Sequence, residues 1–257
     1  KALYDLNAGA DGYNVAIGFA AGENMTTGPN NVLIGAYAGD ALTTGSNNIA
    51  IGVGALGSED GNSYNVAIGT NALNALNAGA DAYNVAVGHN AGTAVSTGIR
   101  NTIMGGLAGD ALTTGSDNIA IGYAALSSSD TGSRTVAIGS YALEDQNPTG
   151  SDYFYNVAIG YTAGRDITTG TNNTIIGGLA GDALTTGGGN TVLGYSALSA
   201  EDTGSRNVAI GQEALGALNY DGEAYNTAVG FAAGKLVSTG VANTIIGGLA
   251  GDALTTG

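Results

Sequence analysis

The stretch Asn14-Val15-Ala16-Ile17-Gly18 is the first copy of a five-residue motif, Asn-x-apolar-apolar-Gly, that decides the fold. Fourteen copies of the motif occur, and Thr135 takes the place of the Asn in one of them. The copies begin at Asn14, Asn31, Asn48, Asn65, Asn84, Asn101, Asn118, Thr135, Asn156, Asn173, Asn190, Asn207, Asn226 and Asn243. Repetition at a fixed period indicates a repeat architecture, in which each unit packs on its neighbours.

Two periods are present in the chain. Successive motifs are 17 residues apart, except that every fourth spacing is 19 or 21 residues. The fourth unit of each group therefore carries a longer loop. This pattern predicts super-repeats of four units over residues 14–83, 84–155 and 156–225, with an incomplete one over 226–257. We expect residues 1–257 to form one continuous segment of a longer fibre, because the chain begins and ends within the pattern.

The residues of each unit predict an all-β fold, a parallel β-solenoid with one coil for about every 17 residues. Units of this length are too short for helical-pair repeats, which need about 33 residues or more. Gly and Asn recur every few residues and break helices. The apolar run of each motif is short and rich in β-branched residues, which is typical of a short strand.

Three columns of residues predict specific geometry. The motif Gly, from Gly18 to Gly247, predicts a positive φ or a backbone approach that leaves no room for a Cβ. The Ala three residues later, from Ala21 to Ala250, predicts an interior site with room for one methyl group. The Asn column predicts a ladder in which side-chain amides bond to the neighbouring coils.

The two faces of each strand are both apolar. Side chains alternate along a strand, so Val15 and Ile17 point to one face while Asn14 and Ala16 point to the other. The Ile17 column is large in every unit, and we expect it to fill the interior of the coil. A strand apolar on both faces is buried on both faces, so we expect the other face to pack against another subunit. On that face the second units carry large residues, at Leu33, Ile103, Ile175 and Ile245.

The composition excludes several classes of function. The chain has 21 acidic and 6 basic residues, a net charge of −15, and it has no Cys. Nucleic-acid binding is not expected, because contacts with phosphates need clustered Lys and Arg. The lack of Cys excludes disulfides and thiolate metal sites. No run of about 20 apolar residues occurs, so we expect no membrane insertion by this segment.

Enzyme activity is not expected. The only His is His89, which follows a motif Gly in the same column as Phe19, Tyr161 and Phe231. Ring packing between coils is therefore a better interpretation of His89 than a general base. Paired carboxylates could act in catalysis, but a repeat spreads the same residues uniformly, whereas an active site needs one unique constellation. We assign no catalytic, cofactor-binding or metal-ligating residues.

A second column of rings precedes the first unit of each group. The rings are Tyr13, Tyr83, Tyr155 and Tyr225. Packing of rings between coils is again preferred to a platform for a ligand.

Acidic residues of the second units are the candidates for a cation site, at Asp40, Asp110, Asp182 and Asp252. Residues one coil apart lie about 4.8 Å from each other. Arg165 with Asp182 and Lys235 with Asp252 are therefore expected as ion pairs. Glu23 with Asp40 is a like-charge pair that could hold Ca²⁺. A calcium-dependent repeat would place ligands in every coil, so we expect no cofactor, with structural calcium as the alternative.

The repeated Thr-Thr-Gly sequences, at 43–45 and 113–115, raise the alternative of an ice-binding surface. Adjacent Thr residues on a strand would face opposite ways, however, and later units replace them with sequences such as Ser127-Ser128-Ser129-Asp130. We interpret these Thr residues as turn residues.

The fourth-unit loops differ in length and sequence while the residues around them repeat. They span residues 74–82, 144–154 and 216–224. Exposed loops often carry function, which makes them the best candidates for a specific site, and neutral drift at a tolerant position is the alternative.

The motif resembles a known family. Asn14-Val15-Ala16-Ile17-Gly18, followed by Ala21-Gly22, resembles the NSVAIG-type motif repeated in the YadA-like heads of trimeric autotransporter adhesins. Runs such as residues 30–39 are also similar to repeats in some bacterial and phage fibre proteins. The resemblance covers essentially the whole chain. It implies a left-handed parallel β-roll, a homotrimer around one axis and a role in attachment, although the coil here is longer than the usual head repeat.

These observations predict a structural and adhesive extracellular fibre segment, part of a cell-surface appendage or adhesin. Its expected partner is itself, as a homotrimer or another homo-oligomer. The alternative is a phage tail fibre, located on the virion, that binds a host-surface receptor. A soluble ice- or ligand-binding solenoid is a third class and predicts a monomer.

Overall fold

The computed structural model of the chain describes residues 2–4, 12–147 and 153–257. These residues form short strands joined by turns and bends, and no helix occurs among them, which confirms the predicted all-β class. No described segment is therefore a helix long and apolar enough to cross a membrane. The chain divides into two compact halves, Lys1–Thr131 and Gly132–Gly257, which are built in the same way.

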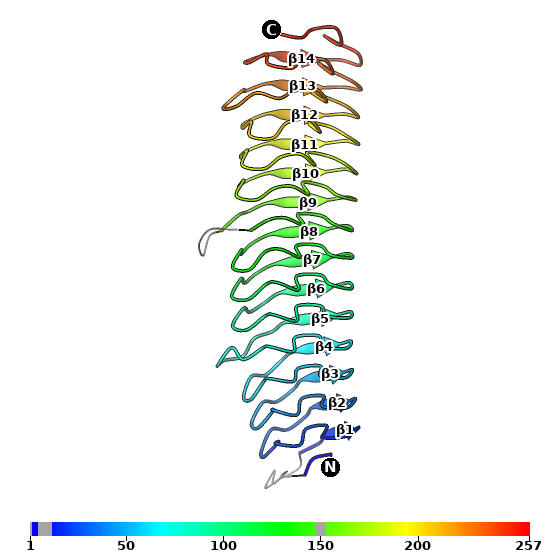
Figure 1. Ribbon diagram of the computed structural model, residues 1–257, viewed down its shortest axis with the longest axis vertical. Coiled ribbons are helices and arrows are strands. Elements are labelled where there is room, and N and C mark those ends of the chain that lie inside the picture. The colour runs from blue at the N-terminus through cyan, green and yellow to red at the C-terminus, as the bar shows by residue number, and fades with distance from the viewer. Residues whose placement is uncertain (1, 5–11, 148–152) are drawn as a thin grey trace. The chain divides into compact units, whose positions relative to one another are not determined.

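In the first half, seven three-residue strands are stacked in chain order (Figure 1). They are β1 (Val15–Ile17), β2 (Val32–Ile34), β3 (Ile49–Ile51), β4 (Val66–Ile68), β5 (Val85–Val87), β6 (Thr102–Met104) and β7 (Ile119–Ile121). Each strand pairs in parallel with the next, and Val15 of β1 lies opposite Val32 of β2, one repeat later. Each coil therefore adds one strand, which confirms the predicted parallel β-solenoid.

The second half contains seven further strands with the same parallel pairing in every ladder described. They are β8 (Val136–Ile138), β9 (Val157–Ile159), β10 (Thr174–Ile176), β11 (Thr191–Leu193), β12 (Val208–Ile210), β13 (Thr227–Val229) and β14 (Thr244–Ile246). The longer loops leave the register intact, because Val136 of β8 still lies opposite Val157 of β9. The extra residues are accommodated between strands.

The motif Gly closes each strand against the next coil. At Gly52 the backbone has φ +135°, and a Cβ built there would lie 2.4 Å from the carbonyl oxygen of Gly69. No side chain fits such a contact, and few non-Gly residues adopt such a φ. Both geometric reasons predicted for this Gly are confirmed. The predicted interior Ala is confirmed as well, since this residue is fully buried in every coil except that of Ala250.

The face of each strand that points into the coil is the one that was predicted to point outward. The middle strand residue is fully buried from Leu33 to Ala120 in the first half and from Ala137 to Ala228 in the second. The third residue is outside instead, with Ile17 60% and Met104 40% exposed. The prediction that the Ile17 column fills the coil is therefore wrong. The coil is so narrow that its own turns occupy most of the interior, and most strand centres have room only for Ala.

Where the strand centre is large, glycines in the turns make room for it. A Cβ on Gly22 would lie 2.7 Å from Leu33 Cδ1, and a Cβ on Gly39 would lie 2.8 Å from Leu33 Cδ2. The next two coils reverse the arrangement: the buried Leu56 and Leu73 stand where these glycines stand, and the strand centres are alanines. The interior volume is thus filled in two complementary ways.

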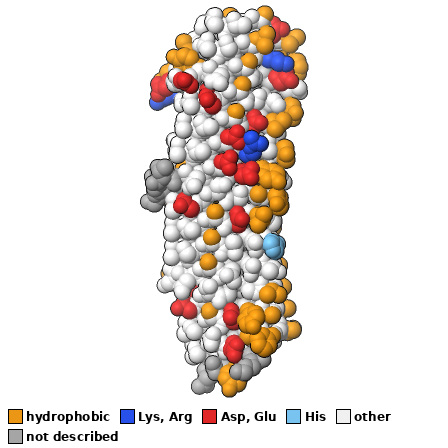
Figure 2. Space-filling model, viewed as in Figure 1, with side chains coloured by type: hydrophobic (Ala, Val, Ile, Leu, Met, Phe, Trp, Pro, Cys, Tyr) orange, Lys and Arg blue, Asp and Glu red, His pale blue; other side chains and the backbone are white. Residues whose placement is uncertain are grey.

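Hydrophobic side chains are nevertheless abundant on the outside of the coils. Figure 2 shows them gathered along one side of the view in each half. We call the first and third residues of each strand the outer strand face, and the middle residue together with the motif Asn the inner strand face.

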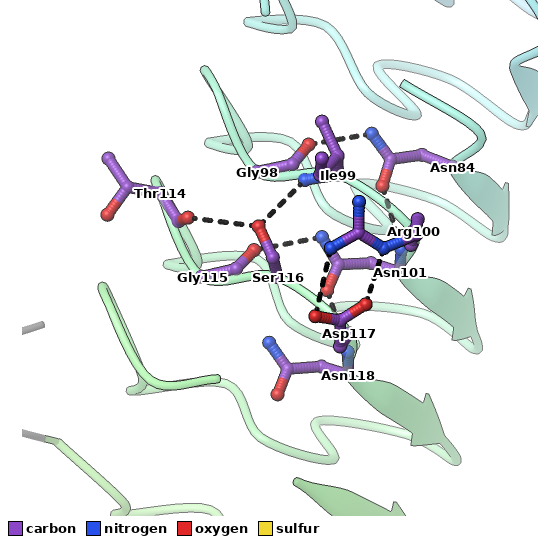
Figure 3. A network of polar contacts seen from close by, with 10 residues as sticks. All are labelled: Asn84, Gly98, Ile99, Arg100, Asn101, Thr114, Gly115, Ser116, Asp117 and Asn118. Carbon is purple, nitrogen blue, oxygen red and sulfur yellow. Dashed lines mark hydrogen bonds and ion pairs between the residues drawn. The ribbon is translucent and has the colours of Figure 1, made fainter. Parts of the chain in front are cut away.

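The Asn column forms the predicted ladder on the inner strand face. Each Asn Oδ1 accepts the backbone N–H of the next Asn, as Asn84 does from Asn101 at 2.9 Å (Figure 3). In most coils the Asn Nδ2 donates to the carbonyl of a turn residue fourteen positions later, as from Asn101 to Gly115 at 2.9 Å. These bonds satisfy buried polar groups that water cannot reach.

One position breaks the Asn ladder and is repaired by another side chain. Thr135 has the Asn position in β8's coil, and its shorter side chain cannot span the same distance. The buried Gln146 inserts there, donating to Thr135 Oγ1 at 3.0 Å and accepting from Asn156 Nδ2 at 3.0 Å. A continuous column of side-chain hydrogen bonds is thereby kept in the second half.

Candidate functional site

The outer strand face is the largest functional candidate in each half. In the first half it consists almost wholly of Val and Ile, with one Thr and one Met. Its residues are Val15, Ile17, Val32, Ile34, Ile49, Ile51, Val66, Ile68, Val85, Val87, Thr102, Met104, Ile119 and Ile121. In the second half four of the seven first-strand positions are Thr, while the third positions remain Ile, Val or Leu.

Most side chains of this face are half-buried, and the most exposed ones lie in a few strands. Val15 and Ile17 in the first half, and Leu193 and Ile246 in the second, are between 45% and 69% exposed. No strand residue carries a charge. The outer strand face therefore offers an uncharged surface rich in β-branched side chains. Its burial against a partner would stabilise the complex by about 25 cal/mol per Å² of apolar area.

Aromatic rings pack between neighbouring coils beside the strands. Tyr64 and Tyr83 stack with ring centroids 5.0 Å apart and planes 4° apart, and Phe19 meets Tyr37 edge to face at 5.4 Å. In the second half Tyr141 and Tyr161 meet edge to face at 6.3 Å. The interpretation of the rings as packing between coils is confirmed for these pairs. His89, the residue considered for catalysis, is exposed in the turn after β5.

Polar side chains cover the turn that precedes each strand. In the first half Arg100 forms a bidentate ion pair with Asp117 of the next coil, at 2.6 and 3.0 Å (Figure 3). Beside this pair, the Ser116 hydroxyl accepts the backbone N–H of Ile99 at 3.1 Å. The charges of Arg100 and Asp117 thus neutralise each other, and the polar side chains of this turn are engaged in contacts within the chain.

The predicted ion pairs of the second half have other partners. Arg165 forms its ion pair with the adjacent Asp166 at 2.6 Å, and Lys235 binds Glu213 of the preceding coil at 2.5 Å. The predicted pairs with Asp182 and Asp252 are therefore wrong. The long basic side chains reach carboxylates of the same coil or the preceding coil instead of the acidic residue one coil further on.

The acidic residues considered for calcium do not gather into a cluster. Partial burial raises the pKa of Asp40, Asp110 and Asp182, and the charge of Glu23 adds to the effect at Asp40. No group of three or more His, Cys, Asp or Glu side chains that could hold a metal ion occurs among the described residues. The Glu23–Asp40 pair thus offers two carboxylates and no third.

Two carboxyl groups lie inside the coils, where sequence reasoning placed none. Glu59 is fully buried, and its Oε1 accepts the backbone N–H groups of Gly61 and Asn62 at 3.1 and 2.7 Å. Burial raises the pKa of Glu59 to about 6. Burial also raises the pKa of Glu201, which accepts backbone N–H groups from Gly204 and Tyr220. Both stand in a column occupied elsewhere by residues such as Met25 and Leu42, which was the available sequence signal.

The fourth-unit loops pack onto the coils. Leu76 and Ala82 of loop 74–82, and Leu218 and Ala224 of loop 216–224, are fully buried. In loop 144–154, residues 148–152 lie outside the described residues. Loops 74–82 and 216–224 are anchored by these apolar residues, and loop 144–154 contributes the buried Gln146 to the Asn ladder.

The repeated Thr residues lie in bends rather than in strands, as predicted. The Thr43 hydroxyl donates to the carbonyl of Asp60 in the next coil at 2.7 Å. Equivalent bonds run from Thr113 to Asp130 and from Thr185 to Asp202. The hydroxyls thus hold the turns together.

Comparisons of the chain with protein-family models, with curated proteins and with solved structures found no match. The resemblance to YadA-like head repeats stays a prediction. Function must therefore be argued from the surfaces of the chain itself.

Proposed function

We propose that this chain is a structural and adhesive segment of an extracellular fibre of the adhesin type, and that it acts as a homotrimer. The observation that carries the proposal is the outer strand face, where Val and Ile side chains of successive coils point outward and are half-buried or exposed. Seven strands about 4.8 Å apart make this band roughly 30 Å long in the first half alone. A continuous apolar band of this kind marks an interaction site.

A second copy of the chain is the partner that fits this band best. The band repeats its apolar side chains once per coil, and only a surface of the same period matches it along its whole length. Other copies of the chain have that period. They can also approach there despite a net charge of −15 each, because the strands contain no acidic residue.

The finer architecture of the proposal is a left-handed β-roll built from super-repeats of four coils. The alternation of interior filling supports the super-repeat. Large strand centres such as Leu33 and Ile103 are paired with turn glycines, and the following coils pair Ala strand centres with Leu56 or Leu126. Each group of four coils would then be the smallest unit that fills its own interior. The resemblance to the head repeats supports the handedness and the number of chains.

The adhesive role is assigned to the turns rather than to the strands. In a trimer joined through the outer strand face, the polar turn columns and the fourth-unit loops stay accessible to solvent. Each coil contacts only its neighbours, so such a rod can carry different side chains in different coils without a change of fold. The proposed extracellular location follows from this role.

Assembly can be tested by sedimentation equilibrium. We expect the wild-type chain to sediment at three times its own mass. The double variant Ile34→Lys/Ile68→Lys places two charges on the outer strand face and should shift the mass toward that of one chain, because burying unpaired ammonium groups is costly.

Ser58→Lys is the matched control, since Ser58 is exposed in a turn away from the strands. It adds the same kind of charge and should leave the trimer intact. A wild-type chain that stays monomeric at all concentrations would contradict the proposal.

A further inference from the structure

One turn of the second half departs from the repeat pattern. Gly187-Gly188-Gly189 stands where the first half has Gly45-Ser46-Asn47 and Gly115-Ser116-Asp117. In the first half these positions are filled: Ser46 contacts Ser63 at 3.2 Å, and Asp117 binds Arg100 (Figure 3). In the second half two side chains are missing from the same place.

A groove of about 520 Å³ opens at this position. Its size lies within the range of small-ligand sites. Gly188 and Gly189 are among the residues that line it, and no strand residue lines it. The groove is therefore separate from the outer strand face and would stay open in an assembly joined through that face.

The walls of the groove are polar but uncharged over most of their extent. Hydroxyl groups come from Thr169, Thr171, Thr186 and Ser205, and an amide comes from Asn172. The Ser205 hydroxyl accepts the backbone N–H of Gly188 at 3.0 Å, which links two of the lining residues. Such a lining offers both donors and acceptors of hydrogen bonds at short intervals.

One end of the groove carries an ion pair beside an exposed ring. Arg206 binds Glu223 at 2.8 Å, and both line the groove. The Tyr225 hydroxyl also donates to Glu223, and the Arg206 guanidinium lies 5.6 Å from the centre of the Tyr225 ring. Tyr225 is 51% exposed and contacts Arg206 and Glu223, two residues that line the groove.

We propose that this groove binds a short, neutral saccharide. Hydroxyl and amide groups match the closely spaced hydroxyls of a sugar, and an exposed aromatic ring beside them can pack on the sugar's apolar C–H face. This inference rests on the adhesive half of the proposed function, for which it names the ligand class and the site.

Other ligand classes fit the groove less well. An apolar ligand would cover the hydroxyl and amide groups and leave them without hydrogen-bond partners, which is unfavourable. A phosphate or nucleic acid would need unpaired cations, but Arg206 is neutralised by Glu223 and the chain is strongly acidic.

The test is binding of the wild-type chain to an array of immobilised di- to tetrasaccharides, both neutral and sialylated, followed by calorimetric titration with the best free saccharide. Gly189→Asn fills the groove and should weaken binding at least tenfold. The fold should tolerate it, because Gly189 has φ +69° and Asn47 has φ 57° at the equivalent position. Its Cβ would meet only Arg206 Cγ, at an ordinary 3.7 Å.

A second pair of variants tests the role of the ring. Tyr225→Asn removes the ring and should weaken binding about tenfold, which corresponds to about 1.4 kcal/mol. Tyr83→Asn is the matched control, because Tyr83 precedes a strand at the equivalent position of the first half, also with positive φ, at 53°. It should leave binding unchanged.

The proposal is overturned if no neutral saccharide binds, if only sialylated saccharides bind, or if Gly189→Asn binds as well as the wild type. The mass of the assembly, measured on the same sample, separates this result from the proposed function. A trimer that binds no saccharide overturns the groove alone, whereas a monomer that binds one through the groove overturns the trimer alone.

Discussion

The inner and outer faces of one strand differ in what determines their residues. In β4, Ala67 is fully buried against the turns of its own coil, while Ile68 points outward and is only half-buried. Both residues are apolar, so hydropathy alone does not distinguish their surroundings. On the inner face the size of a residue is limited by the space that the backbone leaves. On the outer face it is limited only by contact with solvent or with a partner. Fit to the backbone thus sets residue size inside, and self-association is proposed to set it outside.

The largest expected effect on stability comes from the motif Gly that follows each strand. Gly52→Ala places a Cβ 2.4 Å from the Gly69 carbonyl oxygen, at a φ of +135° that Ala rarely adopts. We expect a loss of about 3 kcal/mol or more in the free energy of unfolding, or failure to fold. Urea unfolding followed by circular dichroism measures it.

Gly106→Ala is the matched control, since the nearest atom to its Cβ would be Tyr123 Cδ2 at 3.7 Å. It should change stability by about 0.5 kcal/mol or less. Equal losses for the two variants would mean that backbone contact does not limit the inner region.

The Asn ladder is expected to give the next largest effect. Asn48→Ala removes the acceptor of the Asn65 backbone N–H, at 2.9 Å, and the donor to the Asn62 carbonyl, also at 2.9 Å. Two buried groups lose their partners, so we expect a loss of about 2 kcal/mol. The same unfolding experiment should show little change for Asn47→Gly, because Asn47 is exposed and has a positive φ that Gly adopts freely. Equal free energies of unfolding for the two variants would mean that the Asn ladder does not contribute to stability.

Substituting Leu for one residue on each face tests the assignment of the faces directly. Ala67→Leu adds volume to a fully buried site and should cost about 1–3 kcal/mol. Ile68→Leu keeps its volume on the outer face and should cost about 0.5 kcal/mol or less in the free energy of unfolding of the single chain. Thermal unfolding at a concentration where the chain is monomeric gives both values. The reverse ranking would restore the arrangement first predicted from the sequence.

The smallest expected effect is a pH dependence that arises inside the coil. The pKa of Glu59 is about 6 in the folded chain against an ordinary 4.5, so the folded chain binds more protons between these values. Stability should therefore rise as pH falls from above 6 to below 4.5, by at most about 2 kcal/mol from Glu59. Burial of Glu201 acts in the same direction.

Glu59→Gln/Glu201→Gln should be more stable than the wild type at pH 7.5 and should show a flatter profile. Gln keeps an acceptor for the backbone N–H groups without a charge. A double variant with the full wild-type pH dependence would show that surface carboxylates cause it.

The sequence predicts the coil better than it predicts the direction of the side chains. The motif placed the strands, the Gly contact, the interior Ala and the Asn ladder correctly, because each depends on backbone geometry repeated in every coil. The choice of the inner face failed because large residues were assumed to fill the interior. The sequence held a better signal: Gly39 accompanies the large Leu33, whereas Leu56 and Leu73 accompany Ala50 and Ala67. Such exchange of volume occurs only between residues that share one interior.

The candidate sites were less predictable for a different reason. Arg165 and Lys235 have side chains long enough to reach several carboxylates, so spacing alone could not select Asp166 or Glu213. The groove at Gly188 and Gly189 was visible only as a departure from the other super-repeats. In a repetitive chain, a unique site is most easily found where one copy differs from the rest.

The constant register across loops of different length has a consequence for how such a chain can change over generations. Val66 lies opposite Val85 and Val136 opposite Val157, although these coils are 2 and 4 residues longer than the usual 17. Small insertions are absorbed in the loop of one coil, while the number of stacked strands changes only by whole coils. Gene duplication can therefore add coils stepwise, and point mutation in the turns can alter their surface independently.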